Sequence, residues 1–208
     1  MKGQPPCIPH GARPFYEERE PTDVEMSEAH ESLVHWQTPE EFDSKVRAFD
    51  SLVKSSTLFN RANAGFLLDA IPIAALAKHR AVQSVRLVRQ RERLNDGQFR
   101  STNETIDIEV TEILDPGRKR GDEYRCDAQQ SVRHFDPGLG ETIAHQLAKG
   151  VKKKADKGYT TTPLLLVYLN ILSGGRLGGE IEIAIERLRV EYANAFREIC
   201  VLWGTKWC

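Results

Sequence analysis

The sequence predicts an α/β protein, a three-layer sandwich in which helices cover both faces of a mixed sheet of four to five strands. Two segments carry this prediction. Residues Thr105–Leu114 alternate apolar and polar side chains with the period of two that a strand requires. Residues 164–171, LLLVYLNI, are apolar almost throughout, which is typical of a strand covered on both faces. The last strand–helix–strand unit is expected to be a right-handed parallel crossover.

Composition sets the limits of this fold. The chain has 208 residues, 40% hydrophobic and 28% charged, which suits one globular domain with a tail. No run of 18 apolar residues occurs, so we expect no membrane partner. The four cysteines are scattered and the first residues lack an apolar leader, so we expect reduced thiols and a cytoplasmic location.

The first 50 residues are acidic, with 5 Lys/Arg against 11 Asp/Glu, a net charge of −6. Residues 1–37 are also rich in proline and poor in branched apolar residues. We therefore expect a weakly ordered leader over 1–37 and a single α/β domain over 38–208.

The first helix of the domain is expected to begin after Thr38, an N-cap candidate that precedes Pro39 and two glutamates. A second apolar helical pattern covers 60–79, where Pro72 predicts a kink or a break. A strand is expected over 82–93. The Asn95-Asp96-Gly97 sequence then predicts a tight hairpin turn before a short strand over 98–101.

The second half of the chain repeats a helix–strand order. A helix is expected over 139–157, with Lys154 on the same stripe as the apolar side chains. After the apolar strand, a helix with Ile181, Ile185 and Leu188 on one face leads to a last strand at Glu198–Trp203.

Strand Thr105–Leu114 also carries the sharpest candidate site. Asp107 and Glu109 lie on one face of it, about 7 Å apart, since residues i and i+2 are two rises apart. Two such carboxylates can share a hard divalent cation, which prefers oxygen ligands. A solvent-facing strand would show the same alternation, so both interpretations stay open at this point.

The order of an acidic Asp-Gly turn, an apolar strand carrying Glu109-Val110-Thr111, a lysine-bearing helix and a buried strand resembles the restriction-endonuclease-like PD-(D/E)XK nuclease superfamily, over residues 60–203. The sequence is most similar to divergent bacterial members whose strand reads Glu-Val-Thr-Glu. The resemblance implies an αβββαβ core and Mg²⁺- or Mn²⁺-dependent hydrolysis of phosphodiesters. Asp96 and Glu109 would be metal ligands, and Asp107 is a third candidate from the strand pattern.

The sequence departs from that pattern at Thr111, where the superfamily has a lysine. A hydroxyl cannot supply the positive charge that helps to stabilise the transition state. Some members of the superfamily carry the lysine on the following helix, and Lys154 is the candidate here. The catalytic set implied by the resemblance is therefore Asp96, Glu109, Thr111 and Lys154, with a solvated charge run as the alternative for the lysines of 152–157.

Arginines and lysines near this strand are candidates for contacts with a nucleic-acid backbone. They are Arg89 and Arg91, which alternate along one strand face, and the loop residues Arg118, Lys119 and Arg120. Pairing of the strand arginines with the acidic leader is the competing explanation.

Two functions follow from these patterns. One is divalent-metal-dependent hydrolysis of DNA or RNA. The alternative is a catalytically inactive module that binds nucleic acid or a protein partner, which the missing lysine favours. The oligomeric state stays open, a homodimer included.

Overall fold

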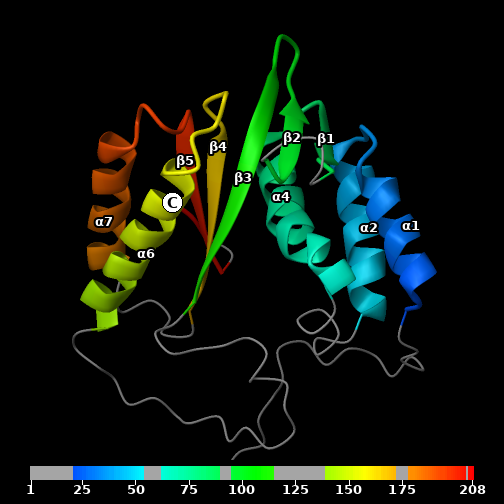
Figure 1. Cartoon of the computed structure of the whole chain (residues 1–208), viewed down its shortest axis with the longest axis horizontal. Coiled ribbons are helices and arrows are strands. Elements are labelled where there is room, and N and C mark those ends of the chain that lie inside the picture. Colours follow the sequence, from blue (N-terminus) through cyan, green and yellow to red (C-terminus); the bar gives the residue numbers. More distant parts are fainter. Residues whose placement is uncertain (1–20, 54–61, 90–94, 115–138, 172–177, 205) are drawn as a thin grey trace, which may run out of the picture.

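The computed structural model describes residues 21–53, 62–89, 95–114, 139–171, 178–204 and 206–208 (Figure 1). Its centre is a mixed open sheet with the strand order β1-β2-β3-β4-β5-β6. The strands are β1 (Ser84–Leu87), β2 (Gly97–Arg100), β3 (Thr105–Leu114), β4 (Leu164–Asn170), β5 (Glu198–Trp203) and the two-residue β6 (Lys206–Trp207). The predicted α/β class with a mixed sheet is confirmed, with β6 added after the strands expected from the sequence.

Strand directions divide the sheet into two parts. The first three strands form an antiparallel meander, whereas β3, β4 and β5 are parallel. The parallel strands are joined by α6 (Leu139–Ala155) and α7 (Gly178–Glu191). The predicted parallel connection from β4 through α7 to β5 is present, and β3 and β4 are joined by a second one through α6; the apolar strand β4 lies between β3 and β5 as its composition predicts.

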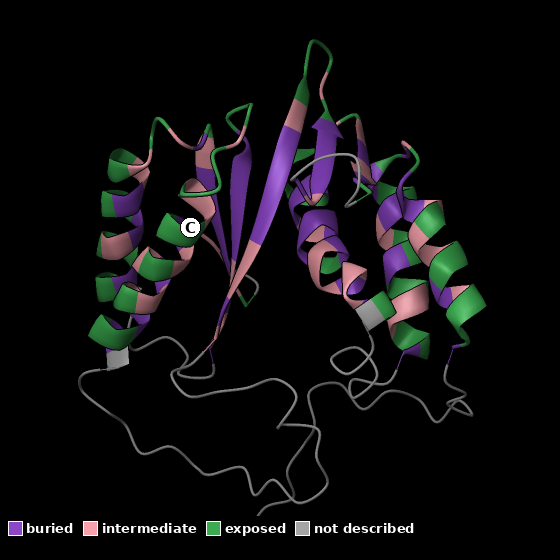
Figure 2. Ribbon diagram, viewed as in Figure 1, coloured by how far each residue is buried: buried purple, intermediate pink, exposed green. Residues whose placement is uncertain are grey.

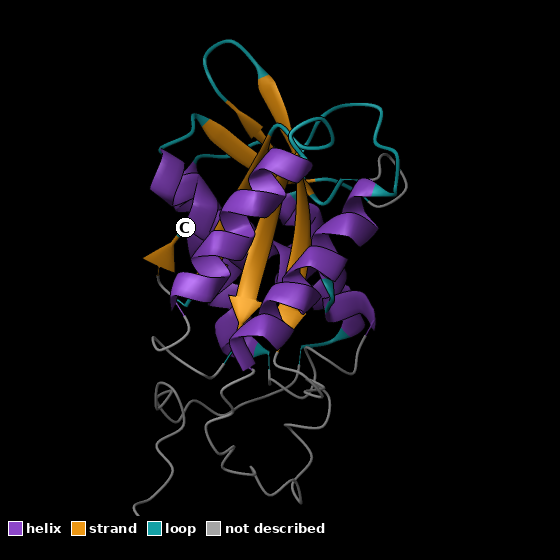
Figure 3. Ribbon diagram, turned by 90° about the vertical axis from the view of Figure 1, so that its left-hand side faces the viewer, coloured by secondary structure: helices purple, strands orange, loops and turns teal. Residues whose placement is uncertain are grey.

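Helices cover both faces of the sheet (Figures 1 and 3). On one side lie α1 (Asp23–Leu33), α2 (Pro39–Leu52) and α4 (Phe66–Arg80), and on the other α6 and α7. The start of α2 follows the sequence prediction, because the Thr38 hydroxyl accepts a hydrogen bond from the Glu41 amide at 3.2 Å. The Glu41 carboxylate in turn accepts one from the Thr38 amide at 3.0 Å, which completes a capping box.

The two sides of the sheet bury separate apolar cores, which Figure 2 shows as the inward faces of the helices and strands. The core below α2 and α4 includes Phe42, Ile73, Phe99, Ile108 and Leu166. The core below α6 and α7 includes Ile113, Leu147, Val167, Ile185 and Val201. Because neighbouring residues of a strand face opposite sides, a polar residue of β3 must lie against one of these helix layers or in an opening between them.

Several expectations need correction. The second half of the expected leader is ordered: Asp23–Leu33 form α1, whose Met26 and Leu33 are buried. Pro72 lies inside α4 and does not break it. Strand β1 ends at Leu87, well before residue 93. Residues 1–20 lie outside the described part of the chain.

The Asp-Gly pair is not a tight hairpin turn. Strands β1 and β2 pair antiparallel, but Gly97 already belongs to β2 and lies opposite Leu87. A Cβ at Gly97 would lie 2.7 Å from the Ile73 side chain of α4. The glycine is therefore required where α4 packs closely on the strand, and not by the dihedral angles of a turn.

None of the helices in the described residues combines the length and apolarity that a membrane crossing needs.

Candidate functional site

The pairing of β2 with β3 brings Asp96 beside Glu109. Gly97 lies opposite Ile108 and Gln98 opposite Asp107, so continuation of this register places Asp96 opposite Glu109. Backbone and side chain both fix the aspartate, since its amide donates to the Ile108 carbonyl at 2.9 Å and its Oδ2 accepts from the Val110 amide at 2.7 Å. The two carboxylates predicted from the sequence as metal ligands are thus neighbours.

A third carboxylate, Asp69, comes from the first turn of α4. Helix α4 lies close to β2 because Gly97 leaves room for Ile73, and Asp69 lies one helical turn before Ile73. Charges on Asp96 and Glu109 both act on the Asp69 carboxyl. Three separate elements, α4, the start of β2 and the middle of β3, therefore contribute one carboxylate each.

Glu109 is fully buried and is paired with two lysines. Its Oε1 accepts from the Lys154 ammonium of α6 and, at 2.7 Å, from the Lys157 ammonium just after that helix. Helix α6 comes close to β3 at Gly150, where a Cβ would lie 2.6 Å from Ile113. Lys154 is one turn further along α6, and this places its side chain over Glu109 as the helical stripe predicts.

Burial and mutual repulsion change the titration of these groups. Partial burial and the Asp96 charge raise the pKa of Asp69 to about 7. Burial and the Glu109 charge raise the pKa of Asp96, against the hydrogen bond from the Val110 amide. Burial acts to lower the pKa of Lys157, but its hydrogen bond to Glu109 and the charges of Glu109 and Asp96 together raise it. When all three carboxylates are ionised, the cluster therefore holds more negative charge than its two lysines neutralise.

Two polar atoms of the cluster, Glu109 Oε2 and the Tyr159 hydroxyl, are buried without a well-formed hydrogen bond among the described residues, although the hydroxyl lies close enough to the Glu109 carboxylate to interact with it. Burial and the nearby Glu109 carboxylate raise the pKa of the tyrosine, so it remains a neutral hydroxyl. A buried carboxylate oxygen and a buried hydroxyl without partners are costly, and such pairs mark a place for a water or a ligand.

Asp107 lies on the same face of β3 but has a different environment. Its Oδ1 accepts a hydrogen bond from the Gln98 side-chain amide at 2.7 Å, and its Oδ2 accepts one from the Thr161 hydroxyl at 2.8 Å. The structure therefore groups Asp69 with Asp96 and Glu109, and gives Asp107 neutral hydrogen-bond donors. Thr111 is half-buried on this face, and a Cβ at Gly150 of α6 would lie 4.0 Å from its hydroxyl.

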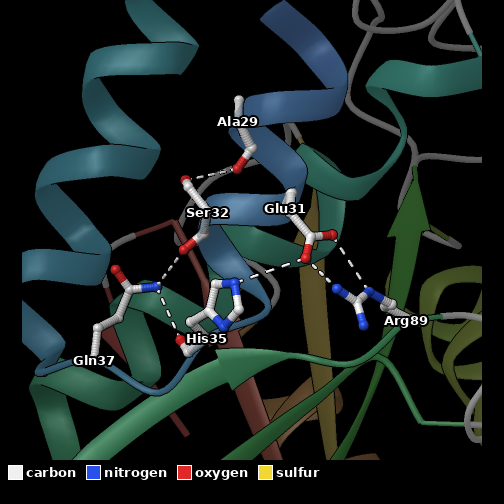
Figure 4. Close-up of polar contacts among 6 residues, drawn as sticks. All are labelled: Ala29, Glu31, Ser32, His35, Gln37 and Arg89. Atoms are coloured by element: carbon white, nitrogen blue, oxygen red, sulfur yellow. Dashed lines mark hydrogen bonds and ion pairs between the residues drawn. The ribbon is translucent and has the colours of Figure 1, made fainter. Parts of the chain in front are cut away.

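The predicted nucleic-acid contacts have mixed outcomes. Arg89 forms an ion pair with Glu31 of α1, which also lies 3.7 Å from His35 (Figure 4). Pairing with the acidic N-terminal region, the competing explanation, therefore describes Arg89 in this structure. Arg91 and the loop residues Arg118, Lys119 and Arg120 lie outside the described part of the chain.

The sequence alone did not predict three members of the cluster: Asp69, Lys157 and Tyr159. Asp69 lies in an apolar helical stretch, and a lone carboxylate among apolar residues was a signal that could have identified it. In a helix that continued to residue 157, we expect Lys157 on a different face from Lys154. Helix α6 ends at Ala155, so the turn after it returns Lys157 toward Glu109.

The arrangement offers three carboxylates, two ammonium groups and a neutral phenol in a partly buried site. Such a set can hold a hard cation and can place positive charge beside a phosphate. Among the described residues, no three His, Cys, Asp or Glu side chains already have the spacing of a bound metal ion.

Comparison of the chain with protein-family models, with curated proteins and with solved structures finds no match.

Proposed function

We propose that the protein hydrolyses phosphodiester bonds of nucleic acid with the help of Mg²⁺ or Mn²⁺, as a divergent PD-(D/E)XK-like nuclease. The observation that carries this proposal is the convergence of Asp69, Asp96 and Glu109 from three elements, with Lys154 directly on Glu109. The succession α4-β1-β2-β3-α6-β4 supports it, since it has the αβββαβ order that the resemblance implies.

The residues fit a divalent cation in two respects. Glu109 Oε2 is buried and receives no well-formed hydrogen bond from a described residue, although the Tyr159 hydroxyl lies near the same carboxylate. Burial and the neighbouring carboxylates raise the pKa values of Asp69 and Asp96, so a cation between them would relieve the part that is due to repulsion. When bound, Mg²⁺ lowers the pKa of a coordinated water and offsets charge that develops on the phosphate.

Each protein group then has a role. Asp96 and Glu109 would hold the cation, with Asp69 as the third ligand in place of Asp107. Lys154 would provide the positive charge that Thr111 lacks, because its ammonium already reaches the Glu109 carboxylate. Thr111 can orient a water through its hydroxyl but cannot neutralise charge.

A catalytically inactive module that binds nucleic acid or a protein partner is the second candidate. The observation that favours it is the double pairing of Glu109 Oε1 with Lys154 and Lys157, which already compensates the buried charge without a metal. In this case the cluster is structural, and divalent cations should have no specific effect.

A cytoplasmic location belongs to the same proposal. Its support is that Cys200 and Cys208, the two cysteines in the described residues, are both free thiols.

A metal titration followed by thermal unfolding tests the proposal. An ion at ten times its Kd stabilises the fold by about 1.4 kcal/mol, or roughly 3–6 °C for a chain of this size. We expect this increase with Mg²⁺ or Mn²⁺ for the wild type and for Glu112→Gln, a control on the same strand. Glu109→Gln should abolish it and remain folded.

Hydrolysis separates the two candidates. With metal bound, oligonucleotide cleavage by the wild type and a loss of at least about a hundredfold in Lys154→Met support the nuclease. Specific metal binding without cleavage of single- or double-stranded DNA or RNA would favour the inactive module. Absence of any metal-dependent change in melting temperature would contradict the metal site itself.

A further inference from the structure

One side of the sheet faces α6 and α7 where these helices cover β3 to β5. On β1 and β2, the same side of the sheet carries arginines. Val85 and Leu87 of β1 are buried below α2 and α4, so Arg86 between them points to the opposite side. Arg100 of β2 lies opposite Ser84, on the same side as Arg86, and is exposed. Among the described residues, the helices that pack on β1 and β2 are α2 and α4, and no described helix covers this side of the two strands.

Trp36 lies at the edge of this surface, in the turn between α1 and α2. Its neighbour Gln37 exchanges two backbone hydrogen bonds with Val85 of β1, at 3.2 and 2.9 Å. The Gln37 side-chain amide also donates to the carbonyls of Ser32 and His35, at 3.1 and 3.2 Å (Figure 4). The tryptophan is therefore held in a fixed position beside the strands.

Both arginines lie over the indole of Trp36. The guanidinium carbon of Arg100 is 4.2 Å from the ring centroid, and that of Arg86 is 5.1 Å from it. Arg86 also donates to the Gln98 amide oxygen at 2.9 Å. Neither arginine has a carboxylate partner among the described residues.

Five other arginines of the described chain do have such partners: Arg47, Arg80, Arg89, Arg189 and Arg197. Arg187 also lacks such a partner among the described residues, but only Arg86 and Arg100 of the described arginines lie together on one aromatic ring without a counter-ion. Their mutual repulsion would be relieved by an anion, and a guanidinium fork matches the oxygens of a phosphate.

This surface continues toward the carboxylate cluster. Arg86, Gln98 and Asp107 lie side by side across β1, β2 and β3. Asp96 and Glu109 follow two residues further along β2 and β3, a distance of about 7 Å. A chain with regularly spaced phosphates that lies on the arginines can therefore reach the cluster.

We propose that Trp36, Arg86 and Arg100 form a binding site for single-stranded nucleic acid and direct the strand to the carboxylate cluster. The guanidinium groups bind the phosphates, and an unpaired base stacks on the layer that they form with the indole. A base within a duplex is already stacked and paired, so it cannot use this layer. The inference deepens the proposed function by naming its substrate class, and rests on that function for the fate of the strand, but binding itself needs no hydrolysis.

Fluorescence anisotropy with a labelled 12-nucleotide single strand, in EDTA, tests the site apart from any metal. Trp36→Leu should weaken binding by roughly tenfold or more, as loss of one stacked base does. The double variant Arg86→Gln/Arg100→Gln should weaken binding and lower the slope of log affinity against log salt by about 1.4, for two phosphate contacts.

Matched controls define the site. Trp207→Leu removes an aromatic residue that stacks on His79 near β6, and Arg47→Gln removes an exposed arginine of α2. Both should bind the strand like the wild type. Trp36→Phe should retain most of the affinity, and the single variant Arg100→Gln, at an exposed position, tests the site if Trp36→Leu does not fold.

Two results would overturn the inference: unchanged binding in the Trp36 and arginine variants, or equal affinity for a duplex of the same sequence. Failure of the proposed hydrolysis has a different signature. In that case Glu109→Gln and the wild type both bind the single strand through Trp36, and neither cleaves it when Mn²⁺ is added.

Discussion

The side of the sheet that faces α6 and α7 has two halves with opposite character. Below the helices, this side of β4 and β5 presents Leu165, Val167, Leu169, Ile199 and Val201, all of them buried in one apolar core. On β1, β2 and the first part of β3, the same side presents Arg86, Gln98, Arg100, Asp107 and Glu109. The two halves meet in β3, where Glu109 lies opposite Leu165.

The difference shows that chain connectivity decides where polar residues can be placed. Helices α6 and α7 are the crossovers of the parallel strands, so they cover β3 to β5. The antiparallel meander needs no crossover, and none of the helices in the described part of the chain covers this side of it. Glu109 lies at the boundary, buried at one end of a helix that supplies lysines, and this is where a carboxylate can be both desolvated and paired.

The covered half should be the least tolerant of charge. Val167 has no exposed surface and lies under α6 and α7, so Val167→Asp would bury an unpaired carboxylate. We expect a loss of more than about 4 kcal/mol in the free energy of unfolding, enough to prevent folding. Chemical denaturation measures this loss.

Ser84→Asp is the matched control on the open half of the same side. Ser84 is half-buried on β1, opposite Arg100, and we expect a change within about 0.5 kcal/mol. A similar loss in both variants would mean that the two halves do not differ as described.

Sequence alone predicted the parts of the fold that have strong local signals. The limits of β3 and β5, the start of α2 at Thr38 and the Lys154 stripe follow from alternation, capping chemistry and helical spacing. The order of α1 did not, because acidic residues and prolines near it gave a weak local pattern. Its order depends on tertiary burial of Met26 and Leu33.

The candidate site could be predicted only where it is local in sequence. Asp96 and Glu109 became candidates through a resemblance that rests on two local patterns, an Asp-Gly sequence and an alternating strand. Asp69 joins them through packing of α4 on Gly97, which no local pattern contains. Asp107 satisfies the same alternation as Glu109, and the two differ in their neighbours: Gln98 and Thr161 donate to Asp107, whereas Lys154 and Lys157 pair with Glu109.

Removal of the Asp69 charge should stabilise the carboxylate cluster, which lies at the boundary between the two halves. The pKa of this carboxyl is raised from 3.8 to about 7, which sets an upper limit of about 4 kcal/mol on its cost when ionised. The other carboxylates relax when one is neutralised, so we expect Asp69→Asn to stabilise the metal-free protein by about 1–3 kcal/mol at pH 8.

The sign of the pH dependence follows from the same shift. Between pH 4 and 7 the folded protein holds a proton on Asp69 that the unfolded chain has released, so stability falls as pH rises through this range. Melting temperatures of the wild type at pH 5, 6, 7 and 8, without metal, should therefore decline more steeply than those of Asp69→Asn. Parallel curves would contradict the shift.

Loss of one lysine at the boundary should have a smaller effect. Lys154 is 16% exposed and pairs with fully buried Glu109, but Lys157 remains to compensate the carboxylate. We expect Lys154→Met to cost about 1–2 kcal/mol in urea denaturation, below the 3–5 kcal/mol of an isolated buried pair. Lys153→Met, at an exposed neighbouring position of α6, should stay within about 0.5 kcal/mol; an equal cost in both would show that the ion pair adds nothing.

The smallest effect is expected where the open half meets α1. Arg89 and Glu31 are both about half exposed, and exposed ion pairs contribute about 0.2–1 kcal/mol. Arg89→Gln should therefore lower stability by no more than this amount, and less at 1 M salt, because screening weakens exposed pairs. It should leave single-strand binding unchanged, since Glu31 already neutralises this arginine.

Arg86→Gln has the opposite expectation: Arg86 faces Trp36 and no carboxylate of the described residues, so binding should weaken while stability changes little. Equal losses of binding in the two variants would mean that the arginines act through overall charge, and that the pairing of Arg89 with α1 does not set it apart.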